Sequence, residues 1–274
     1  MNNWVIAVIL GVVEGLTEFL PVSSTGHLII AGNLLGFVGD KASRFEVIIQ
    51  LGAILSVVFL YWKRFIRLLP ARERSLIRER STLDGWSGLW RIALATFPAL
   101  LVGYLARHRI KEELFNPETV TWALAVGGAA ILLVERFVAR RATDDVDHLT
   151  LWQALGVGLF QVLALWPGTS RAAATIIGGM VVGLDRKSAA EFSFLIAVPI
   201  MFAATGYEFL KMREQLVVQD SLQLAVGFLV SFIVALAAVK GFVQYLQRGK
   251  LAPFAWYRIV AAPVFYFLTR GLSF

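Results

Sequence analysis

The residues best suited to chemistry lie in one stretch, 14–27, which reads E-G-L-T-E-F-L-P-V-S-S-T-G-H. Two carboxylates, Glu14 and Glu18, stand four residues apart and would share one face of a helix. A proline interrupts the run, and a turn of small polar residues leads to His27. An acidic pair beside hydroxyls and an imidazole offers the groups needed for cation binding or for nucleophilic catalysis.

A second polar turn, Pro167-Gly168-Thr169-Ser170-Arg171, follows another apolar run. Each turn would begin a helix, and helix N-termini favour anions through their free N–H groups. The planar fork of Arg171 suits phosphate oxygens. If the two turns meet, they predict a phosphate site whose hydroxyls come from Ser23, Ser24, Thr25, Thr169 and Ser170.

Three catalytic roles follow from these types and spacings. His27 lies one helical turn after Ser24, which permits a nucleophile and its base, with Arg171 as the clamp. Glu14 and Glu18 are hard oxygen ligands beside an anionic substrate, so they predict Mg²⁺ or Ca²⁺ bridging carboxylate and phosphate.

The composition predicts an integral membrane protein. Of 274 residues, 58% are hydrophobic and 16% are charged, whereas soluble domains carry about 25% charged residues. A charge within a membrane segment costs about 2.5–3.5 kcal/mol, so two carboxylates there need a function. The net charge of +7 is typical of basic cytoplasmic loops and does not indicate nucleic acid. The absence of cysteine excludes disulfides and thiol catalysis.

The predicted fold is a single all-α membrane domain with an inverted-topology repeat, six transmembrane helices and two re-entrant helical hairpins. Each half contains one hairpin and three spans, because each polar turn is followed by an apolar run too short to span. The predicted elements of the first half, about 1–138, are the hairpin 4–35 and the spans 45–62, 86–107 and 118–138. Those of the second half, about 151–274, are the hairpin 151–183 and the spans 188–210, 221–242 and 251–270.

The repeat itself rests on aligning Pro21 with Pro167. A hairpin returns to its own side and three spans cross over, so the second half must be inverted, which places a site near the midplane at the repeat interface. Basic residues are more frequent in the loops opposite the N-terminus, above all in 63–85. That bias predicts both termini outside.

Simpler interpretations stay open at this level. A membrane Ser or Thr often bonds only its own helix backbone, and a lone His is more often structural than catalytic. The acidic pair also suits a proton or sodium site, and Arg171 could form a buried ion pair with Glu14 or Glu18. Glu46 and Gln50, four residues apart within a span, either line the same cavity or bond across helices.

The two motifs resemble the signatures of the undecaprenyl-diphosphatase or bacitracin-resistance family, and the segments F-E-V-I-I-Q-L-G and A-A-E-F-S-F-L-I-A-V-P resemble it as well. The resemblance implies a bacterial inner-membrane enzyme that hydrolyses undecaprenyl diphosphate to undecaprenyl phosphate and inorganic phosphate. Such an enzyme recycles the lipid carrier for peptidoglycan and confers bacitracin resistance, with its active site facing the periplasm or cell exterior. The family pattern makes Glu14 and Glu18 the acidic motif, Ser24 and His27 the catalytic pair, and Arg171 the phosphate clamp.

One departure and several alternatives remain. The family usually has S-R-S-G where this chain has Ser170-Arg171-Ala172-Ala173, so a hydroxyl at position 172 is dispensable or replaced. The nucleophile can be Ser24, His27 or water. Lipid phosphatases of the phosphatidic-acid type need two histidines, and His108 and His148 fall in predicted loops. A polyprenyl-phosphate transporter or flippase is the rival from another class, since inverted repeats with half-helix ends are common in transporters. The sequence leaves open a homodimer, the choice of metal and the preferred chain length.

Overall fold

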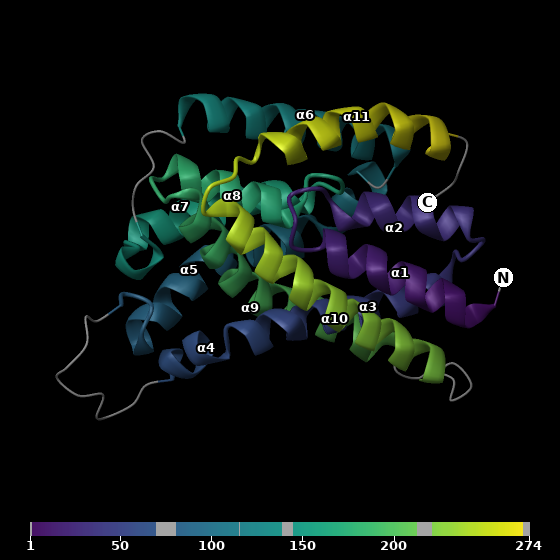
Figure 1. The fold of residues 1–274 in the computed structure, drawn as a ribbon, viewed down its shortest axis with the longest axis horizontal. Coiled ribbons are helices and arrows are strands. Elements are labelled where there is room, and N and C mark those ends of the chain that lie inside the picture. The colour runs from purple at the N-terminus through teal and green to yellow at the C-terminus, as the bar shows by residue number, and fades with distance from the viewer. Residues whose placement is uncertain (1, 70–80, 115, 139–144, 213–220, 271–274) are drawn as a thin grey trace.

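The computed structural model describes residues 2–69, 81–114, 116–138, 145–212 and 221–270. The regular elements over these ranges are helical, as predicted (Figure 1). In chain order they are α1 (Asn3–Thr17), α2 (Ser24–Leu34), α3 (Asp40–Leu60), α4 (Trp62–Leu68), α5 (Gly85–Arg109), η1 (Ile110–Leu114), α6 (Pro117–Phe137), η2 (Val146–His148), α7 (Leu151–Gln161), η3 (Val162–Leu165), α8 (Arg171–Val181), α9 (Arg186–Met212), α10 (Ser221–Leu246) and α11 (Ala252–Thr269). The element η1 is a π-helical turn, and η2 and η3 are 3-10 turns.

Five of the described helices, α3, α5, α6, α9 and α10, are long and apolar enough to cross a membrane. This set is typical of a multi-pass membrane protein. Six spans were predicted. The sixth stretch, 251–270, holds the 18-residue helix α11, which contains Arg258 and Pro263. The arginine lowers the apolar character of α11, and by length and composition α11 therefore does not join the five.

Both polar turns interrupt their helices as the prolines predict. Helix α1 ends at Thr17, four residues before Pro21, because a proline ring clashes with the carbonyl four positions earlier. Helix α7 ends at Gln161 and tightens into η3 before Pro167. The helices that follow, α2 and α8, have 11 residues each, which is too few to span a bilayer.

The helices pack in pairs that join distant parts of the chain. Helix α1 packs on α10, α10 on α3, α5 on α7, and α6 on α11. Helices α6 and α11 lie side by side above the rest in Figure 1. The short helices α1 and α2 occupy the end of the molecule that holds both termini, and α7 and α8 occupy the opposite end.

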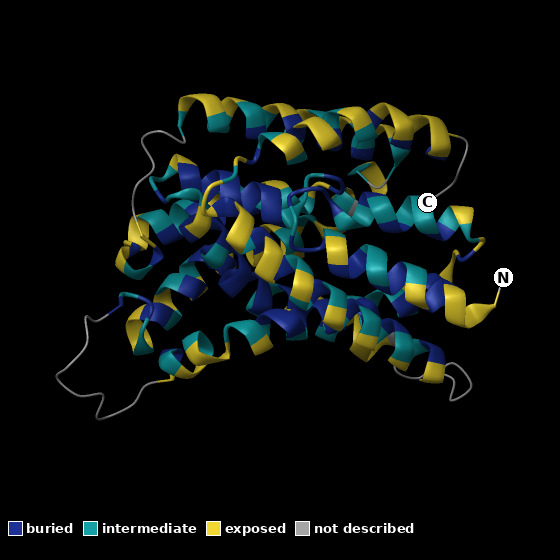
Figure 2. Ribbon diagram, viewed as in Figure 1, coloured by how far each residue is buried: buried dark blue, intermediate teal, exposed yellow. Residues whose placement is uncertain are grey.

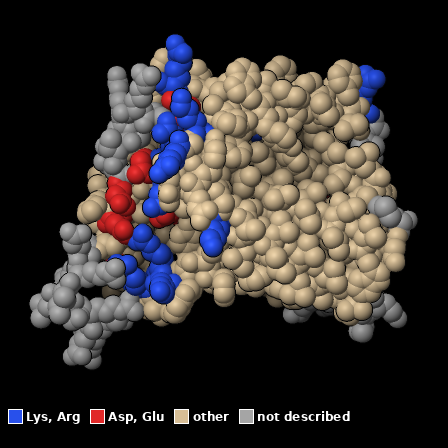
Figure 3. Space-filling model, in the orientation of Figure 1, with Lys and Arg blue, Asp and Glu red and all other residues tan. Residues whose placement is uncertain are grey.

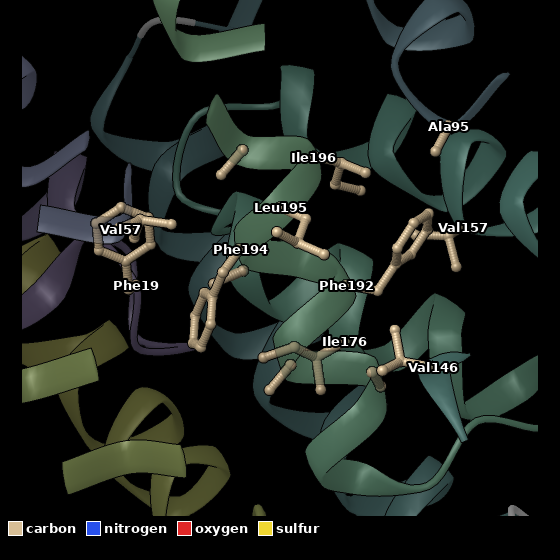
Figure 4. Packing of buried hydrophobic residues seen from close by; sticks show 14 of the residues in the cluster. Phe19, Val57, Ala95, Val146, Val157, Ile176, Phe192, Phe194, Leu195 and Ile196 are labelled. Carbon is tan, nitrogen blue, oxygen red and sulfur yellow. The ribbon is translucent and has the colours of Figure 1, made fainter. Parts of the chain in front are cut away.

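The core lies around α9, the most buried of the five long helices. In its most apolar 18-residue stretch 61% of the residues are buried, against 28–39% in the other four helices. Buried residues accordingly concentrate at the centre of the bundle, whereas the outer faces of α6, α10 and α11 are exposed (Figure 2). Phe19, in the break after α1, meets the edge of Phe194 of α9 at 5.7 Å between ring centroids (Figure 4). This contact fixes the first break against the centre of the fold.

Charged side chains gather at one end of the face shown in Figure 3, while most of the remaining face is uncharged. At the ends of the apolar helices, Arg64 pairs with Asp147, Arg67 with Asp84 at 2.8 Å, and Arg186 with Glu135 at 2.5 Å. These pairs form a polar rim at the end of the bundle opposite the chain termini (Figures 1 and 3).

Two local predictions are corrected by the structure. The stretch 63–85 was predicted as a loop, but α4 covers Trp62–Leu68. Phe65 and Leu68 stand three residues apart, which is a helical spacing, and both pack on the core. His108 was placed in a loop, yet it lies in the last turn of α5. The basic residues of the predicted loops at 72–80 and 140–141 lie outside the described residues.

Candidate active site

The two turns share an unusual backbone conformation. Among the described non-glycine residues, only Ser23 and Ser170 have positive φ, at 74° and 69°. Each stands at the N-cap of the short helix that follows a break. Such a conformation costs about 1–3 kcal/mol and persists where the surroundings enforce it, often at functional sites. The same strained conformation at both turns makes both of them candidates for a functional site.

One cavity of about 170 Å³ lies between the two turns. Seven residues that the sequence singled out line it, and they come from the break after α1, the start of α2, the middle of α3, and the second turn with the start of α8. The lining consists of Glu18, Ser23, Ser24, Thr25, Gln50, Ala164, Trp166, Pro167, Gly168, Ser170, Arg171 and Met201. The predicted meeting of the two polar turns is therefore present in the structure.

Glu18 connects the two turns across this cavity. The Ser24 hydroxyl donates to Glu18 Oε2 at 2.5 Å, and Arg171 Nη2 lies 3.5 Å from Glu18 Oε1. The carboxylate is 7% exposed and the guanidinium 12%, so water screens the pair weakly. Of the two ion pairs left open by the sequence, the structure contains the one between Arg171 and Glu18.

Arg171 is held in place but keeps free donors. Its Nη1 donates to the carbonyl of Ser193 at 3.2 Å, and its guanidinium lies over the Phe19 ring at 5.3 Å. Its Nε has no hydrogen-bond partner, and its Nη2 has only the 3.5 Å ion-pair contact with Glu18 Oε1. Buried donors without partners are costly, and an anion entering the cavity would supply acceptors for them.

His27 is engaged away from Ser24. Its Nδ1 lies 2.7 Å from the Ser23 carbonyl and its Nε2 lies 2.5 Å from the Tyr257 hydroxyl. Because a carbonyl only accepts, neutral His27 carries its proton on Nδ1 and accepts from Tyr257 at Nε2. The imidazole and phenol rings are also stacked, with centroids 5.6 Å apart. Ser24 therefore has Glu18, and not the expected His27, as its hydrogen-bond partner.

The remaining predicted residues surround the cavity without all lining it. Gln50 lines it and accepts from Thr205 at 3.2 Å. Thr169 lines a neighbouring apolar cavity instead. Glu46 lies close enough to Glu14 for their charges to interact.

Glu14 is the residue best placed to hold a cation. It is 1% exposed, and neither carboxylate oxygen has a hydrogen-bond partner. The described residues contain no cluster of three or more His, Asp or Glu side chains fit for a metal. Glu14 and Glu18 could thus bind Mg²⁺ or Ca²⁺ only with further oxygens from phosphate and water, which is a common arrangement for Mg²⁺.

Arg258 is the main site feature that the sequence analysis overlooked. It is fully buried in α11 and donates at 2.7–3.3 Å to the carbonyls of Pro21, Ala123, Leu124, Gly168 and Thr169. Arg258 thereby links α11 to both turns and to α6. Gly127 leaves room for the guanidinium, since a Cβ there would lie 2.2 Å from Arg258 Nη2. An arginine within a predicted span was the available signal, because intramembrane charges are functional candidates.

Comparison with known proteins agrees with this geometry. The chain matches the family model described as bacitracin resistance protein BacA over residues 7–264. A protein of Maridesulfovibrio salexigens named undecaprenyl-diphosphatase is 55% identical over 270 residues, which are 97% of this chain and 99% of that relative. Proteins of the same name from Solidesulfovibrio magneticus and Nitratidesulfovibrio vulgaris are 52% and 53% identical, over 97% of this chain and 99% and 98% of their own lengths. None of these names denotes a transporter. The chain belongs to the BacA family of bacitracin resistance proteins.

Proposed function

We propose that this chain is an undecaprenyl-diphosphatase of the bacterial inner membrane, as its relatives are named. It hydrolyses undecaprenyl diphosphate to undecaprenyl phosphate and inorganic phosphate, and so recycles the lipid carrier. The observation that carries the proposal is Glu18, which accepts from Ser24 of one turn and pairs with Arg171 of the other. A hydroxyl, a base and a phosphate-binding cation are thereby gathered at one cavity.

In this proposal Arg171 binds the terminal phosphate. Its Nε has no partner and its Nη2 has only the long ion-pair contact with Glu18, so its planar fork can donate to phosphate oxygens. Ser23, Thr25 and Ser170 line the same cavity and add hydroxyl or backbone donors. Thr169 was also predicted to bind phosphate, but its place in the apolar cavity favours a contact near the prenyl end of the substrate. Gln50 completes the wall, and Glu46 does not line this cavity.

The contact between Ser24 and Glu18 favours Ser24 as nucleophile and Glu18 as base. Ser24 Oγ attacks the terminal phosphorus, its proton passes to Glu18, and the bond from that phosphorus to the bridging oxygen breaks. Undecaprenyl phosphate leaves. Water then hydrolyses the phosphoserine and restores the Ser24 hydroxyl as inorganic phosphate departs.

His27 then orients the first turn and is not the base for Ser24. It donates to the carbonyl of Ser23, the residue with positive φ directly before Ser24. The Tyr257 hydroxyl fixes the other side of the ring. Loss of His27 would disturb the aim of Ser24 without removing its proton acceptor.

A divalent cation is proposed to bind beside these residues. Glu14 has two buried oxygens without partners, and Glu18 keeps acceptor capacity beyond its two contacts. Mg²⁺ or Ca²⁺ held by Glu14 and Glu18 would neutralise charge on the diphosphate. The catalytic roles are assigned to one chain, and the homodimer stays a prediction.

The membrane arrangement proposed is an inverted repeat with two re-entrant hairpins, α1–α2 and α7–α8. It is supported by the placement of the two hairpins at opposite ends of the bundle (Figure 1). In the repeat, α7 of the second half corresponds to α1 of the first, and α10 corresponds to α5. The helix contacts agree with this correspondence, because α1 packs on α10 and α7 packs on α5. Both contacts are close at a glycine. A Cβ at Gly11 of α1 would lie 2.8 Å from the Gly227 carbonyl of α10, and one at Gly158 of α7 would lie 2.8 Å from the Ala95 carbonyl of α5.

Both termini and the catalytic cavity are proposed to face the periplasm or cell exterior. Charged side chains gather at the end opposite the termini (Figures 1 and 3). The loops predicted at that end carry more basic residues than those at the other end, and such an excess favours the cytoplasmic side. A cysteine replacing Thr25 should react with an impermeant thiol reagent in intact cells, and a substrate analogue should protect it. Labelling only after the cytoplasmic side is opened would reverse this orientation.

Phosphate release by the detergent-purified protein tests the function directly. The wild type should release inorganic phosphate from undecaprenyl diphosphate and leave undecaprenyl phosphate as the lipid product. Arg171→Lys should fall well below the wild type, because a point charge does not reproduce the planar fork. A folded wild-type protein that releases no phosphate, with or without Mg²⁺ or Ca²⁺, would overturn the proposal.

A further inference from the structure

A closed ring of three hydrogen bonds joins α8 to α9 beside Arg171. Arg171 Nη1 donates to the Ser193 carbonyl at 3.2 Å, and the Thr175 hydroxyl donates to the Arg171 carbonyl at 2.8 Å. The hydroxyl oxygens of Thr175 and Ser193 lie 2.6 Å apart. Because a hydroxyl has one proton and that of Thr175 goes to the carbonyl, Ser193 donates to Thr175. Each side chain of the ring therefore holds another member of it.

The ring is shielded from water. Thr175 and Ser193 are both fully buried, and α8 packs on α9 around them. The neighbours of Ser193 in the chain, Phe192 and Phe194, belong to the hydrophobic core (Figure 4). A hydrogen bond in such surroundings is stronger than one at a wet surface, because water neither screens it nor replaces it.

The ring decides which donors of Arg171 remain for a ligand. Its Nη1 is used by the Ser193 carbonyl, whereas Nε and Nη2 together form another edge of the planar group. That edge has only the 3.5 Å contact with Glu18, and Arg171 lines the polar cavity. A phosphate binds best to such an edge, which offers two parallel N–H donors at once. Holding Nη1 on α9 thus keeps the two-donor edge for an anion.

The corresponding place in the first half cannot form this ring. Ser23 and Ser170, the two N-cap residues with positive φ, mark equivalent positions before α2 and α8. At the place that Thr175 takes in α8, α2 has Leu28, whose side chain has no hydrogen-bonding group. The ring accordingly accompanies the arginine and is not a general feature of the two short helices.

We infer that Ser193 is a positioning residue, which holds Arg171 through Thr175 and through its own carbonyl so that the two-donor edge meets the diphosphate. The inference rests on the proposed diphosphatase function and adds a residue of α9 that lies outside both polar turns. Ser193 is fully buried and does not line the polar cavity, so it acts on the substrate only through Arg171.

The test measures how tightly the detergent-purified protein binds a non-hydrolysable prenyl methylenediphosphonate. S193A keeps the carbonyl but removes the hydroxyl, and it should raise Kd about three- to tenfold, the effect of one hydrogen bond. S231A is the matched control, because Ser231 is also fully buried and donates to the carbonyl of Ile49 on another helix at 2.7 Å. Both variants should lower Tm by similar amounts, whereas S231A should bind as the wild type does. A Kd of S193A equal to that of the wild type, or to that of S231A, would overturn the inference.

A double-mutant cycle with Arg171→Lys separates positioning from a general loss of packing. Lysine has no planar fork to orient, so adding S193A to Arg171→Lys should raise Kd by less than about twofold. An S193A loss of the same size in both backgrounds would show a purely structural role and overturn the inference.

Thr175 gives an independent readout of the same ring. T175V removes its hydroxyl and should weaken binding as S193A does, whereas T175S keeps the hydroxyl and should stay within about twofold of the wild type. Equal Kd values for the two Thr175 variants would also overturn the inference. These binding ratios need no turnover, so a wild type that binds the diphosphonate but releases no phosphate from undecaprenyl diphosphate would instead refute the proposed function.

Discussion

The hydrogen bond from Ser24 to Glu18 gives the sharpest test of the chemistry, through two double-mutant cycles that share Ser24→Ala. The first pairs it with Glu18→Gln and the second with His27→Ala. At 2.5 Å between Oγ and Oε2, the first pair makes a charge-assisted bond of about 1.5–3 kcal/mol. His27 contacts the Ser23 carbonyl and the Tyr257 hydroxyl and has no such bond to Ser24.

The expected magnitudes follow from the proposed roles. Removing a general base lowers the rate by about 10²–10⁴-fold, and Ser24→Ala should cost at least as much. If Ser24 and Glu18 act as one unit, the double variant should be no slower than the slower single variant. For Ser24 and His27 the losses should come closer to multiplying, since His27 acts on the backbone of Ser23.

The assay is phosphate release under single-turnover conditions, which separates chemistry from product release. Thermal unfolding of each variant in detergent accompanies it, because Glu18→Gln leaves Arg171 without its anionic partner and such losses cost about 3–5 kcal/mol in buried pairs. Losses that multiply for Ser24 and Glu18, together with losses that fail to multiply for Ser24 and His27, would refute the assignment of the base. That result would favour Ser24 and His27 as the catalytic pair, as expected from the sequence.

Three further predictions concern Arg258, the divalent cation and the polar rim. Arg258→Met should lower Tm and abolish activity, since three turn carbonyls lose their hydrogen-bond donor at about 1–3 kcal/mol each. Arg258→Lys should keep only part of the wild-type activity, and full activity of this variant would show that the guanidinium fork is not needed. Chelation should stop phosphate release, Mg²⁺ or Ca²⁺ should restore it, and Glu14→Gln should need a higher metal concentration than the wild type. A wild type that keeps its full rate in chelator would exclude Glu14 as a metal ligand. The hydrogen bond from Arg64 holds the pKa of Asp147 below its usual range, so its stabilisation is present above about pH 4 and is lost as pH falls further. Asp147→Asn should therefore lower Tm at pH 7, and its difference from the wild type should shrink as pH falls below about 4. A difference that stays the same over this range would exclude this charge.

Most of the helical framework is predictable from sequence because prolines and apolar runs act locally. Pro21 and Pro167 mark both breaks, and the long apolar runs coincide with α3, α5, α6, α9 and α10 to within a few residues. The gathering of Ser24, Glu18 and Arg171 also follows once the two turns are assumed to meet. That assumption came from the repeated pattern of the two halves, and the shared cavity agrees with it.

The partner of each polar group could not be predicted, because it depends on side-chain direction across helices. Spacing within one helix paired Ser24 with His27, whereas the break turns Ser24 toward Glu18 and His27 toward Tyr257, 230 residues away. Sequence spacing carries no information on a contact of that range. Arg258 was detectable as a charge in an apolar stretch, but its five carbonyl acceptors come from three separate segments.

The source of each group explains why neither half of the chain would suffice alone. The first half supplies Glu18 and Ser24, the proposed base and nucleophile, and the second half supplies Arg171, the proposed phosphate-binding cation. Each turn also depends on Arg258 of the last helix, which binds Pro21 on one side and Gly168 and Thr169 on the other. The strained φ at Ser23 and Ser170 is tolerated because these bonds hold both turns from outside. A catalytic geometry that depends on groups from both halves requires that they fold as a single unit.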